Sequence, residues 1–399
     1  MKKLILSLTN SILLKPVIVK HCSQTIYQAL IGCLRLWDAT QDDKWKKRAE
    51  KLCHIMIDIQ RPDGGFDINY DFNFGMLHKK GESTAPELVS LLALVEYYKR
   101  FGGKDVEAAS KRAAQWIKKH AIKIDDKKWA IPYSPYSTKE VMVYNGTSFA
   151  AGALGVYLSV FPDGELMHIY EGMNKYLYDV LSTDTDLPGK FWYYSDQSRS
   201  NLSYLQREKI DYYHQMQQVE MHVLSELELS AKYQIDIIRM ASEHVAHMQN
   251  KDSVIPYLNT FTAIHLWGFC SCASGFILAA KLIKEKETEY KTKAVGILDW
   301  IVSNSWNGRY FYPIVAEDGQ VVDGKFYVRS DAWVFNTLAL AIKECVYSKK
   351  HIEICEVNYN KMESVGFSGI ENHASNYRIR TVFKLIEIAS RLKRRIWPK

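Results

Sequence analysis

The densest group of chemically capable side chains lies in residues 210–222, which contain the run Asp-Tyr-Tyr-His followed by several glutamines. Asp211 is predicted to cap a helix, which puts Tyr213, His214 and Gln217 in its first two turns. So many polar groups are costly to bury without partners, and a Tyr and a His that meet there can transfer protons near neutral pH. The pattern therefore predicts a proton-transfer site at this helix start, with a purely structural hydrogen-bond network as the alternative.

Polar and aromatic side chains also open other helices that the sequence predicts to be equivalent. These are Glu82 in one helix, Tyr144 and Asn145 in the next, His265 and Trp267 in a third, and Arg329 and Asp331 in a fourth. Arg329 is suited to binding a carboxylate through two parallel hydrogen bonds, unless it pairs with Asp331. Asn145 is either a helix cap or an amide that contacts substrate. Glu82 is either a catalytic acid or an ordinary first-turn acid.

The elements that must position these residues repeat along the chain. A small-residue-rich apolar helix, a turn, an amphipathic helix and an aromatic loop recur at intervals of roughly sixty residues. The first helices of the units open near Cys22, Glu82, Asn145, Asp211, Ile264 and Ser330. Six such hairpins in an open stack would expose apolar surface at both ends. The repeat therefore predicts an all-α fold, an (α/α)6 toroid, in which the starts of the inner helices meet at one end.

Each predicted hairpin pairs an inner helix with an outer one. The pairs are 22–37 with 43–60, 82–101 with 105–120, 145–160 with 164–181, 211–231 with 235–249, 264–283 with 287–304, and 330–346 with 377–395, the last after an irregular insertion. The loops that follow outer helices carry aromatic runs at 129–133, 191–194, 254–257 and 310–313. We expect these runs to be short extended segments at the mouth of the ring, which brings Tyr193 and Tyr194 to the site.

Composition agrees with one large domain. Hydrophobic residues make up 47% of the chain, and there are 25 Tyr and 10 Trp, more than a core needs. No Ser/Gly-rich linker interrupts the apolar pattern, so we expect an N-terminal segment, 1–21, and a single toroid domain, 22–399. The net charge of +7 suits an anionic partner. No nucleic-acid-binding motif occurs, so we expect no nucleic-acid partner.

The sequence lacks the usual patterns for metals and cofactors. His214 and His222 are too far apart along one helix to share an ion, and no zinc, P-loop or dinucleotide motif occurs. We therefore expect neither a metal nor a cofactor.

Targeting signals are weak. The apolar run in residues 1–10 is interrupted by polar residues and has no cleavage site. We therefore expect a cytoplasmic rather than a secreted protein. The basic tail, 391–399, could give peripheral contact with the inner membrane, unless it is simply a solvated last helical turn. The oligomeric state is not predicted.

One part of the chain resembles a known enzyme family. In order, the matching residues are Asn145-Gly146, then Gly-Val-Tyr at 155–157, the aromatic segment Tyr-Tyr-Ser-Asp at 193–196, and Tyr213-His214 with Asp211 displaced by one residue. Together these are similar to the catalytic region of glucuronyl C5-epimerases and related helical-toroid uronate lyases. Two departures stand out: the chain continues for two more hairpins beyond this region, and Gln217 stands where the family has a second His.

The resemblance implies an enzyme that acts on an anionic, glucuronate-containing polysaccharide by removing the proton at C5, as an epimerase or a lyase. Tyr213 or Tyr194 would then be base or acid, His214 the second proton carrier, and Asp211 part of the same catalytic group. The charge of the enolate-like intermediate needs positioned donors, for which the candidates are Arg329, Asn145, His265 and Gln217. The remaining candidates for substrate contacts are Trp267, Tyr144, Tyr193, Glu82 and Asp331.

Two other functions fit the same sequence features. A glycoside hydrolase, either inverting or specific for unsaturated uronyl groups, would need two carboxylates flanking the bond, with Glu82, Asp211 and Asp331 as candidates. A non-catalytic glycan-binding protein of polysaccharide assembly would keep the aromatic cleft and leave Tyr213 and His214 without proton-transfer partners.

Overall fold

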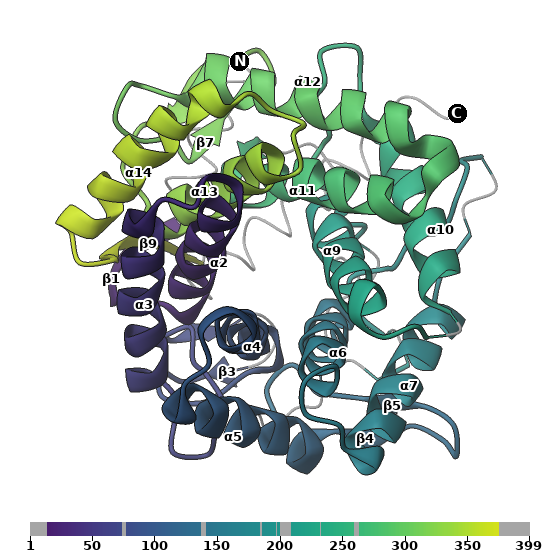
Figure 1. The fold of residues 1–399 in the computed structure, drawn as a ribbon. Helices are drawn as coiled ribbons and strands as arrows, with labels where there is room; N and C mark the ends of the chain where they lie inside the picture. Colours follow the sequence, from purple (N-terminus) through teal and green to yellow (C-terminus); the bar gives the residue numbers. More distant parts are fainter. Residues whose placement is uncertain are drawn as a thin grey trace.

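The computed structural model of the chain describes residues 14–73, 77–136, 141–183, 186–196, 198–199, 209–231, 233–258 and 263–374. In these residues twelve α-helices form two concentric layers (Figure 1). The inner layer consists of α2 (Ser23–Thr40), α4 (Val89–Phe101), α6 (Tyr144–Leu158), α9 (Tyr212–Glu228), α11 (Leu266–Leu282) and α13 (Val328–Lys343). Each inner helix packs on the next, and α13 packs on α2, so the layer closes into a ring. The predicted (α/α)6 toroid is confirmed.

The outer layer alternates with the inner one along the chain. It consists of α3 (Asp43–Asp58), α5 (Lys104–His120), α7 (Gly164–Asp179), α10 (Gln234–Met248), α12 (Glu287–Ser305) and α14 (Ile352–Ser364). One expectation was wrong: the outer partner of α13 is α14, which lies in the stretch expected to be irregular, and the predicted outer helix 377–395 lies outside the described residues. The division into segments 1–21 and 22–399 stays a prediction.

Short extended elements connect the layers. Antiparallel pairs join β1 (Leu14–Lys20) with β9 (Ser368–Ala374), β2 (Phe72–Asn73) with β3 (Leu77–His78), and β4 (Ile122–Lys123) with β5 (Trp129–Ala130). A small sheet has the order β6 (Ile264–His265), β7 (Ile314–Val315), β8 (Val321–Asp323). Three one-turn 3-10 helices complete the elements: η1 (Ala85–Leu88), η2 (Lys284–Lys286) and η3 (Lys349–His351). The pair β1–β9 brings chain segments from both ends of the described region together beside α13 and α2 (Figure 1).

The inner helices approach closely because small residues stand at their contacts. A Cβ at Gly152 of α6 would lie 2.6 Å from the Cβ of Met221 on α9. A Cβ at Gly275 of α11 would lie 2.9 Å from the backbone carbonyl oxygen of Met216 on the same neighbour. Both distances are shorter than atoms tolerate, so glycine is required for this spacing of the ring.

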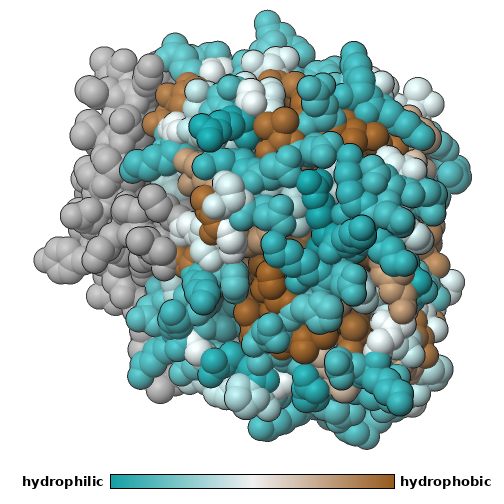
Figure 2. Space-filling view, turned by 60° about the vertical axis from the view of Figure 1, so that its left-hand side comes forward, coloured by the Kyte–Doolittle hydropathy of each residue, from teal (hydrophilic) through white to brown (hydrophobic). Residues whose placement is uncertain are grey.

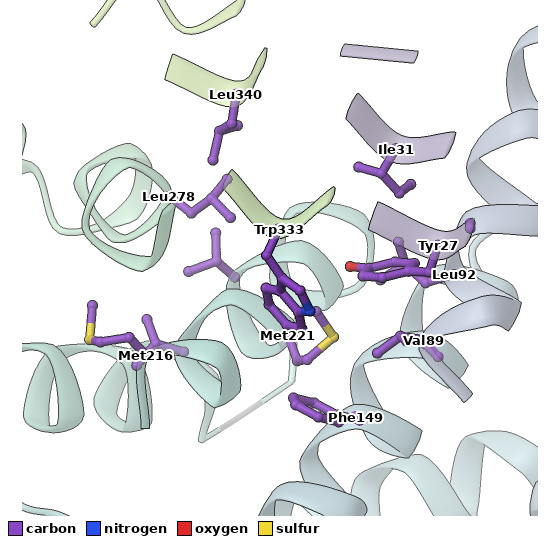
Figure 3. Packing of buried hydrophobic residues seen from close by; sticks show 14 of the residues in the cluster. Tyr27, Ile31, Val89, Leu92, Phe149, Met216, Met221, Leu278, Trp333 and Leu340 are labelled. Carbon is purple, nitrogen blue, oxygen red and sulfur yellow. The ribbon is translucent and has the colours of Figure 1, made fainter. Parts of the chain in front are cut away.

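Apolar side chains fill the ring axis just below the starts of the inner helices. Tyr27, Val89, Phe149, Met221 and Trp333 come from five inner helices and converge there (Figure 3). They leave a space of only about 10 Å³, room for roughly one water molecule. The end of the ring above this plug, where the inner helices start, is called the mouth from here on.

A buried ion pair crosses the ring behind the plug. Arg35 of α2 donates to Glu220 of α9 over 3.2 Å and to the Asn336 side chain over 2.7 Å, and Ser274 donates to the second Glu220 oxygen over 3.0 Å. Glu220 lines the small space on the mouth side, whereas Arg35 lines a cavity of about 450 Å³ at the opposite, far end. The ion pair is therefore the partition between the two ends.

On the side of the molecule shown in Figure 2, hydrophilic residues predominate and the hydrophobic ones form small separate groups. This pattern is expected of outer helices whose apolar stripe faces the inner layer. Among the helices of the described residues, none is both long enough and apolar enough to cross a membrane.

Candidate active site

Trp267, in the first turn of α11, joins the mouth groups of neighbouring helices. Its ring centroid lies 5.5 Å from that of His214 on α9 and 6.3 Å from that of Trp333 on α13. The Arg329 guanidinium of α13 lies 5.7 Å from the same ring, within the range of a cation–π contact. The inner helices therefore bring their predicted polar starts to one end of the ring.

Asp211 and His214 form the tightest polar pair of the mouth. Asp211 caps α9: its Oδ1 accepts the His214 backbone N–H over 3.1 Å, and its Oδ2 lies 2.6 Å from His214 Nδ1. Burial acts to raise the pKa of Asp211, but the His214 contacts and the Lys209 charge outweigh it and lower the pKa. Because an ionised carboxylate only accepts hydrogen bonds, His214 donates through Nδ1, and Nε2 is the ring nitrogen that remains to face a substrate.

Two tyrosines and a lysine surround this pair. Burial, and second the Asp211 charge, raise the pKa of Tyr257, whose hydroxyl is hydrogen-bonded to Asp211. Burial likewise raises the pKa of Tyr194, so both phenols are neutral proton donors. The Lys209 ammonium lies 3.6 Å from the Tyr194 ring centroid, and burial lowers its pKa to about 8. All three groups therefore carry a proton at neutral pH, and Lys209, whose pKa is nearest to it, releases its proton most readily.

His265 stands at the start of α11 beside Tyr257, with the ring centroids 5.4 Å apart. Burial lowers its pKa to about 4, with Asp211 opposing that shift and Arg329 adding to it. The imidazole is therefore neutral at pH 7 and is available as a hydrogen-bond partner or a base.

Sequence reasoning missed Glu87, the most deeply buried acid of the mouth, which is 1% exposed. It lies in η1, immediately before α4, and accepts a 2.7 Å hydrogen bond from Gln24 Nε2. Burial raises its pKa to about 7, against the opposing hydrogen bonds from Ser23 and Gln24. Pro86 was the missed signal, because proline favours the first turn of a helix. It would have placed the helix start after Glu82 and Glu87 inside the first turn.

Three predicted site residues point away from the mouth. Tyr213 is 0% exposed, packs against Gly268 of α11, and donates its hydroxyl to the Ile255 carbonyl over 3.2 Å. Asp331 is also fully buried; its Oδ1 accepts the Phe311 N–H and a hydrogen bond from Asn358 of the outer helix α14. Glu82 lies in the turn before η1, where it accepts the Lys79 N–H over 3.3 Å. The contacts of these three side chains are with core, outer-helix and turn atoms.

The other predicted residues occupy the edge and the floor of the mouth. Gln217 lies at the plug and donates to Ser271 Oγ over 3.2 Å. Tyr144 packs beside Tyr176 of the outer helix α7, and half-buried Tyr193 packs edge-on against Phe191.

Asn145 is not the cap of α6. The helix begins after Val143, which makes no side-chain cap hydrogen bond. The buried Asn145 Oδ1 has no hydrogen-bond partner among the described residues, so its amide remains a candidate for substrate binding. Those residues also contain no group of three or more His, Cys, Asp or Glu arranged to hold a metal ion.

The chain matches no protein-family model and no curated protein. Its structure is similar to that of a cellobiose 2-epimerase from Bacillus thermoamylovorans, with 12% identity, a TM-score of 0.61, and coverage of 82% of this chain and 87% of that one. It is also similar to the GH76A α-1,6-mannanase from a Salegentibacter species (10% identity, TM-score 0.60, 87% and 99% covered). A third similar structure is a polysaccharide lyase (9% identity, TM-score 0.59, 84% and 92% covered). At these identities the likeness shows the shared toroid fold.

Proposed function

We propose that this protein is a carbohydrate-active enzyme that removes the C5 proton of a uronate sugar in an anionic polysaccharide, as an epimerase or a lyase. The observation that carries the proposal is that Arg329 and the His214 of the Asp211–His214 pair both lie against the Trp267 ring. A cation that binds the uronate carboxylate and a base that faces the adjacent carbon are what this reaction needs. The similar structures, which include an epimerase and a lyase by name, support this class.

The roles follow from the geometry. Arg329 would hold the carboxylate and stabilise the charge that develops when C5 loses its proton. Asp211 orients His214 so that Nε2 takes that proton, as in other carboxylate–histidine pairs. Trp267, which is half-buried, offers an aromatic face on which a sugar ring can stack.

The second step decides between the two products. In an epimerase a neutral acid returns a proton to C5 from the opposite face. In a lyase the C4–O bond breaks, a C4=C5 double bond forms, and the acid protonates the departing oxygen. Tyr194, Tyr257 and Lys209 are the acids within the site. Tyr213 takes no part in this scheme because its hydroxyl is bonded to a backbone carbonyl.

One observation favours a glycoside hydrolase as the second candidate. The pKa of Glu87 is raised to about 7 whereas the pKa of Asp211 is lowered, and two carboxyls with separated pKa values are typical of an acid and a base that cleave a glycosidic bond. In that case Glu87 would be the acid, not Glu82 or Asp331.

Incubation with uronate-containing polymers in D2O distinguishes the candidates. Deuterium at C5 without chain cleavage indicates an epimerase, and an unsaturated-uronate product indicates a lyase. New reducing ends alone indicate a hydrolase and would overturn the proposal. Binding of the polymer without any product would favour the non-catalytic glycan-binding alternative.

A further inference from the structure

A chain of hydrogen bonds links the buried Glu87 to Arg329. Gln24, in the first turn of α2, donates through Nε2 to Glu87 Oε1 over 2.7 Å, and its Oε1 accepts from Arg329 Nη1 over 3.3 Å. A single side chain therefore connects the acid in η1 with the cation on α13, although 242 positions separate them (329 − 87). None of the three linked residues, Glu87, Gln24 and Arg329, belongs to the Asp211–His214 pair.

One arrangement of the Ser23 hydroxyl favours a proton on the Glu87 carboxyl. Ser23 Oγ lies 2.8 Å from the Asp67 carbonyl oxygen and is also hydrogen-bonded to Glu87 Oε2. The Asp67 carbonyl only accepts, and a hydroxyl has one hydrogen to donate. When Ser23 donates to Asp67, the Glu87 carboxyl must donate to Ser23. If Glu87 loses its proton, the single Ser23 hydroxyl hydrogen is left to serve two acceptors, the Asp67 carbonyl and the Glu87 carboxylate.

Charged groups around Glu87 come from several elements. Asp67 lies behind Ser23 and is itself held by His78, with Asp67 Oδ1 and His78 Nε2 2.9 Å apart, and by the Gly81 N–H. Arg329 faces Glu87 from α13, and Tyr133 faces it from the segment after β5. Burial, the largest cause, and the Asp67 charge favour the protonated carboxyl, whereas the hydrogen bonds from Ser23 and Gln24 and then the Arg329 charge favour the ionised form. Arg329 therefore contributes to the balance between the two states.

We propose that Glu87 is a positioning residue that acts through Gln24 on Arg329, so that the Glu87 proton sets how strongly Arg329 binds an anionic sugar. With the proton on Glu87, the Arg329 charge is directed to a carboxylate in the mouth. Without it, the Glu87 carboxylate competes with the ligand for the same guanidinium. The inference rests on the proposed function for the identity of the ligand, but the link between the two side chains is independent of it.

The link can be tested without a ligand, by measuring the free energy of unfolding against pH. The folded-state pKa of Glu87, about 7, lies above the ordinary value of 4.5, so its protonated form stabilises the fold below pH 4.5 and that stability is lost as the pH rises through about 7. The stability difference between wild type and Glu87→Gln should therefore change over this range and then level off. The same stability difference is then measured between Arg329→Met and the double variant Arg329→Met/Glu87→Gln. It should level off at a higher pH, because the cation that favours the Glu87 carboxylate is gone.

Gln24→Met should also raise the pH at which the stability difference due to Glu87 levels off, since it removes a hydrogen-bond donor to the Glu87 carboxylate. Its matched control is Gln218→Met, which makes the same change at a buried ring glutamine that is bonded instead to Ser148. Levelling at the same pH with and without Arg329 would overturn the proposed link.

The consequence for binding is tested with D-glucuronate as the probe, by calorimetry between pH 6 and pH 8. The carboxylate of glucuronate stays ionised throughout, and Lys209 and the mouth histidines are present in both proteins. We expect wild type to bind roughly five- to tenfold more weakly at pH 8 than at pH 6, and Glu87→Gln to lose the part of that dependence that comes from Glu87. Equal pH dependence in the two proteins would overturn the role of Glu87. Absence of binding to any variant, with the ligand-free link intact, would instead overturn the uronate substrate.

Discussion

The two ends of the ring use charge in opposite ways. At the far end, aliphatic side chains line the cavity and its rim of charges is fully engaged: Arg100 binds both Asp38 oxygens, at 3.0 and 2.7 Å, and Glu96 at 2.7 Å. Lys343 pairs with Asp38 at 2.6 Å. At the mouth, aromatic rings replace the aliphatic walls, and the pKa of Glu87 is raised whereas the pKa of Asp211 is lowered. Ion pairing at one end stabilises the ring, and the separated pKa values at the other suit the proposed proton transfer.

This contrast predicts that mouth variants change turnover with little effect on stability, whereas variants behind the plug and at the far end do the reverse. The largest effect is expected at His214. Replacing His214 with Ala removes the proposed base, and turnover should fall by about 10²- to 10⁴-fold, measured as product formation on a uronate polymer. The melting temperature should change little because the side chain is half-buried and Asp211 still caps the helix backbone.

The exposed His54 on α3 provides the control: His54→Ala should leave turnover at the wild-type level. Turnover of His214→Ala within a few-fold of wild type would remove this residue from the chemistry and break the contrast between the two ends.

The next largest effect concerns the partition between the ends. Arg35→Met should lower the free energy of unfolding by roughly 3–5 kcal/mol, because Glu220 is left as a buried, unpaired charge. Urea denaturation measures this loss. Replacing both residues with apolar side chains should restore much of it. If Arg35→Met is as stable as wild type, the Arg35–Glu220 ion pair does not stabilise the ring.

Arg329→Lys should lower turnover roughly ten- to hundredfold, as expected for the loss of a charge-assisted hydrogen bond worth about 1.5–3 kcal/mol. The loss of turnover is measured by kinetics on the native polymer and on its carboxyl-reduced form. On the reduced form, the difference in turnover between wild type and Arg329→Lys should vanish. Arg100→Lys makes the same change at the far end and should leave turnover unchanged. Equal processing of both polymers by wild type would contradict a carboxylate partner for Arg329.

The smallest effect is expected at Tyr213, which lies beside the catalytic pair in sequence but packs in the core. Tyr213→Phe should cost about 1 kcal/mol of stability, through the lost hydrogen bond to Ile255, and keep near-wild-type turnover. Tyr194→Phe, the matched change within the mouth, should reduce turnover more. Complete inactivity of a folded Tyr213→Phe protein would return the proton-transfer role to that residue.

The sequence predicted the ring because the repeat and its apolar faces are regular. It also held a signal for α14 that was not recognised: Cys355, Tyr359 and Met362 are buried at helical spacing. The sequence pattern at 377–395 also predicts a helix, and this second candidate for the last outer helix competes with α14.

The site was harder to predict because neighbouring helix residues point in different directions. Tyr213 and His214 are adjacent, yet one faces Gly268 of α11 and the other faces Trp267 in the mouth. Which of them reaches the mouth depends on the rotation of α9 in the ring, and that rotation is set by packing against α11. Glu87 was missed for a related reason, since its contacts with Ser23 and Gln24 join two different hairpins.

Isotope exchange at C5 tests the central claim, that the mouth performs proton transfer on a uronate. Wild type and Arg100→Lys are incubated with a uronate polymer in D2O beside His214→Ala, and deuterium at C5 is followed by NMR and mass spectrometry alongside any unsaturated product. We expect C5 deuterium or an unsaturated uronate at equal rates in wild type and Arg100→Lys, and neither in His214→Ala. Chain cleavage by wild type with no deuterium at C5 and no unsaturated product would contradict it.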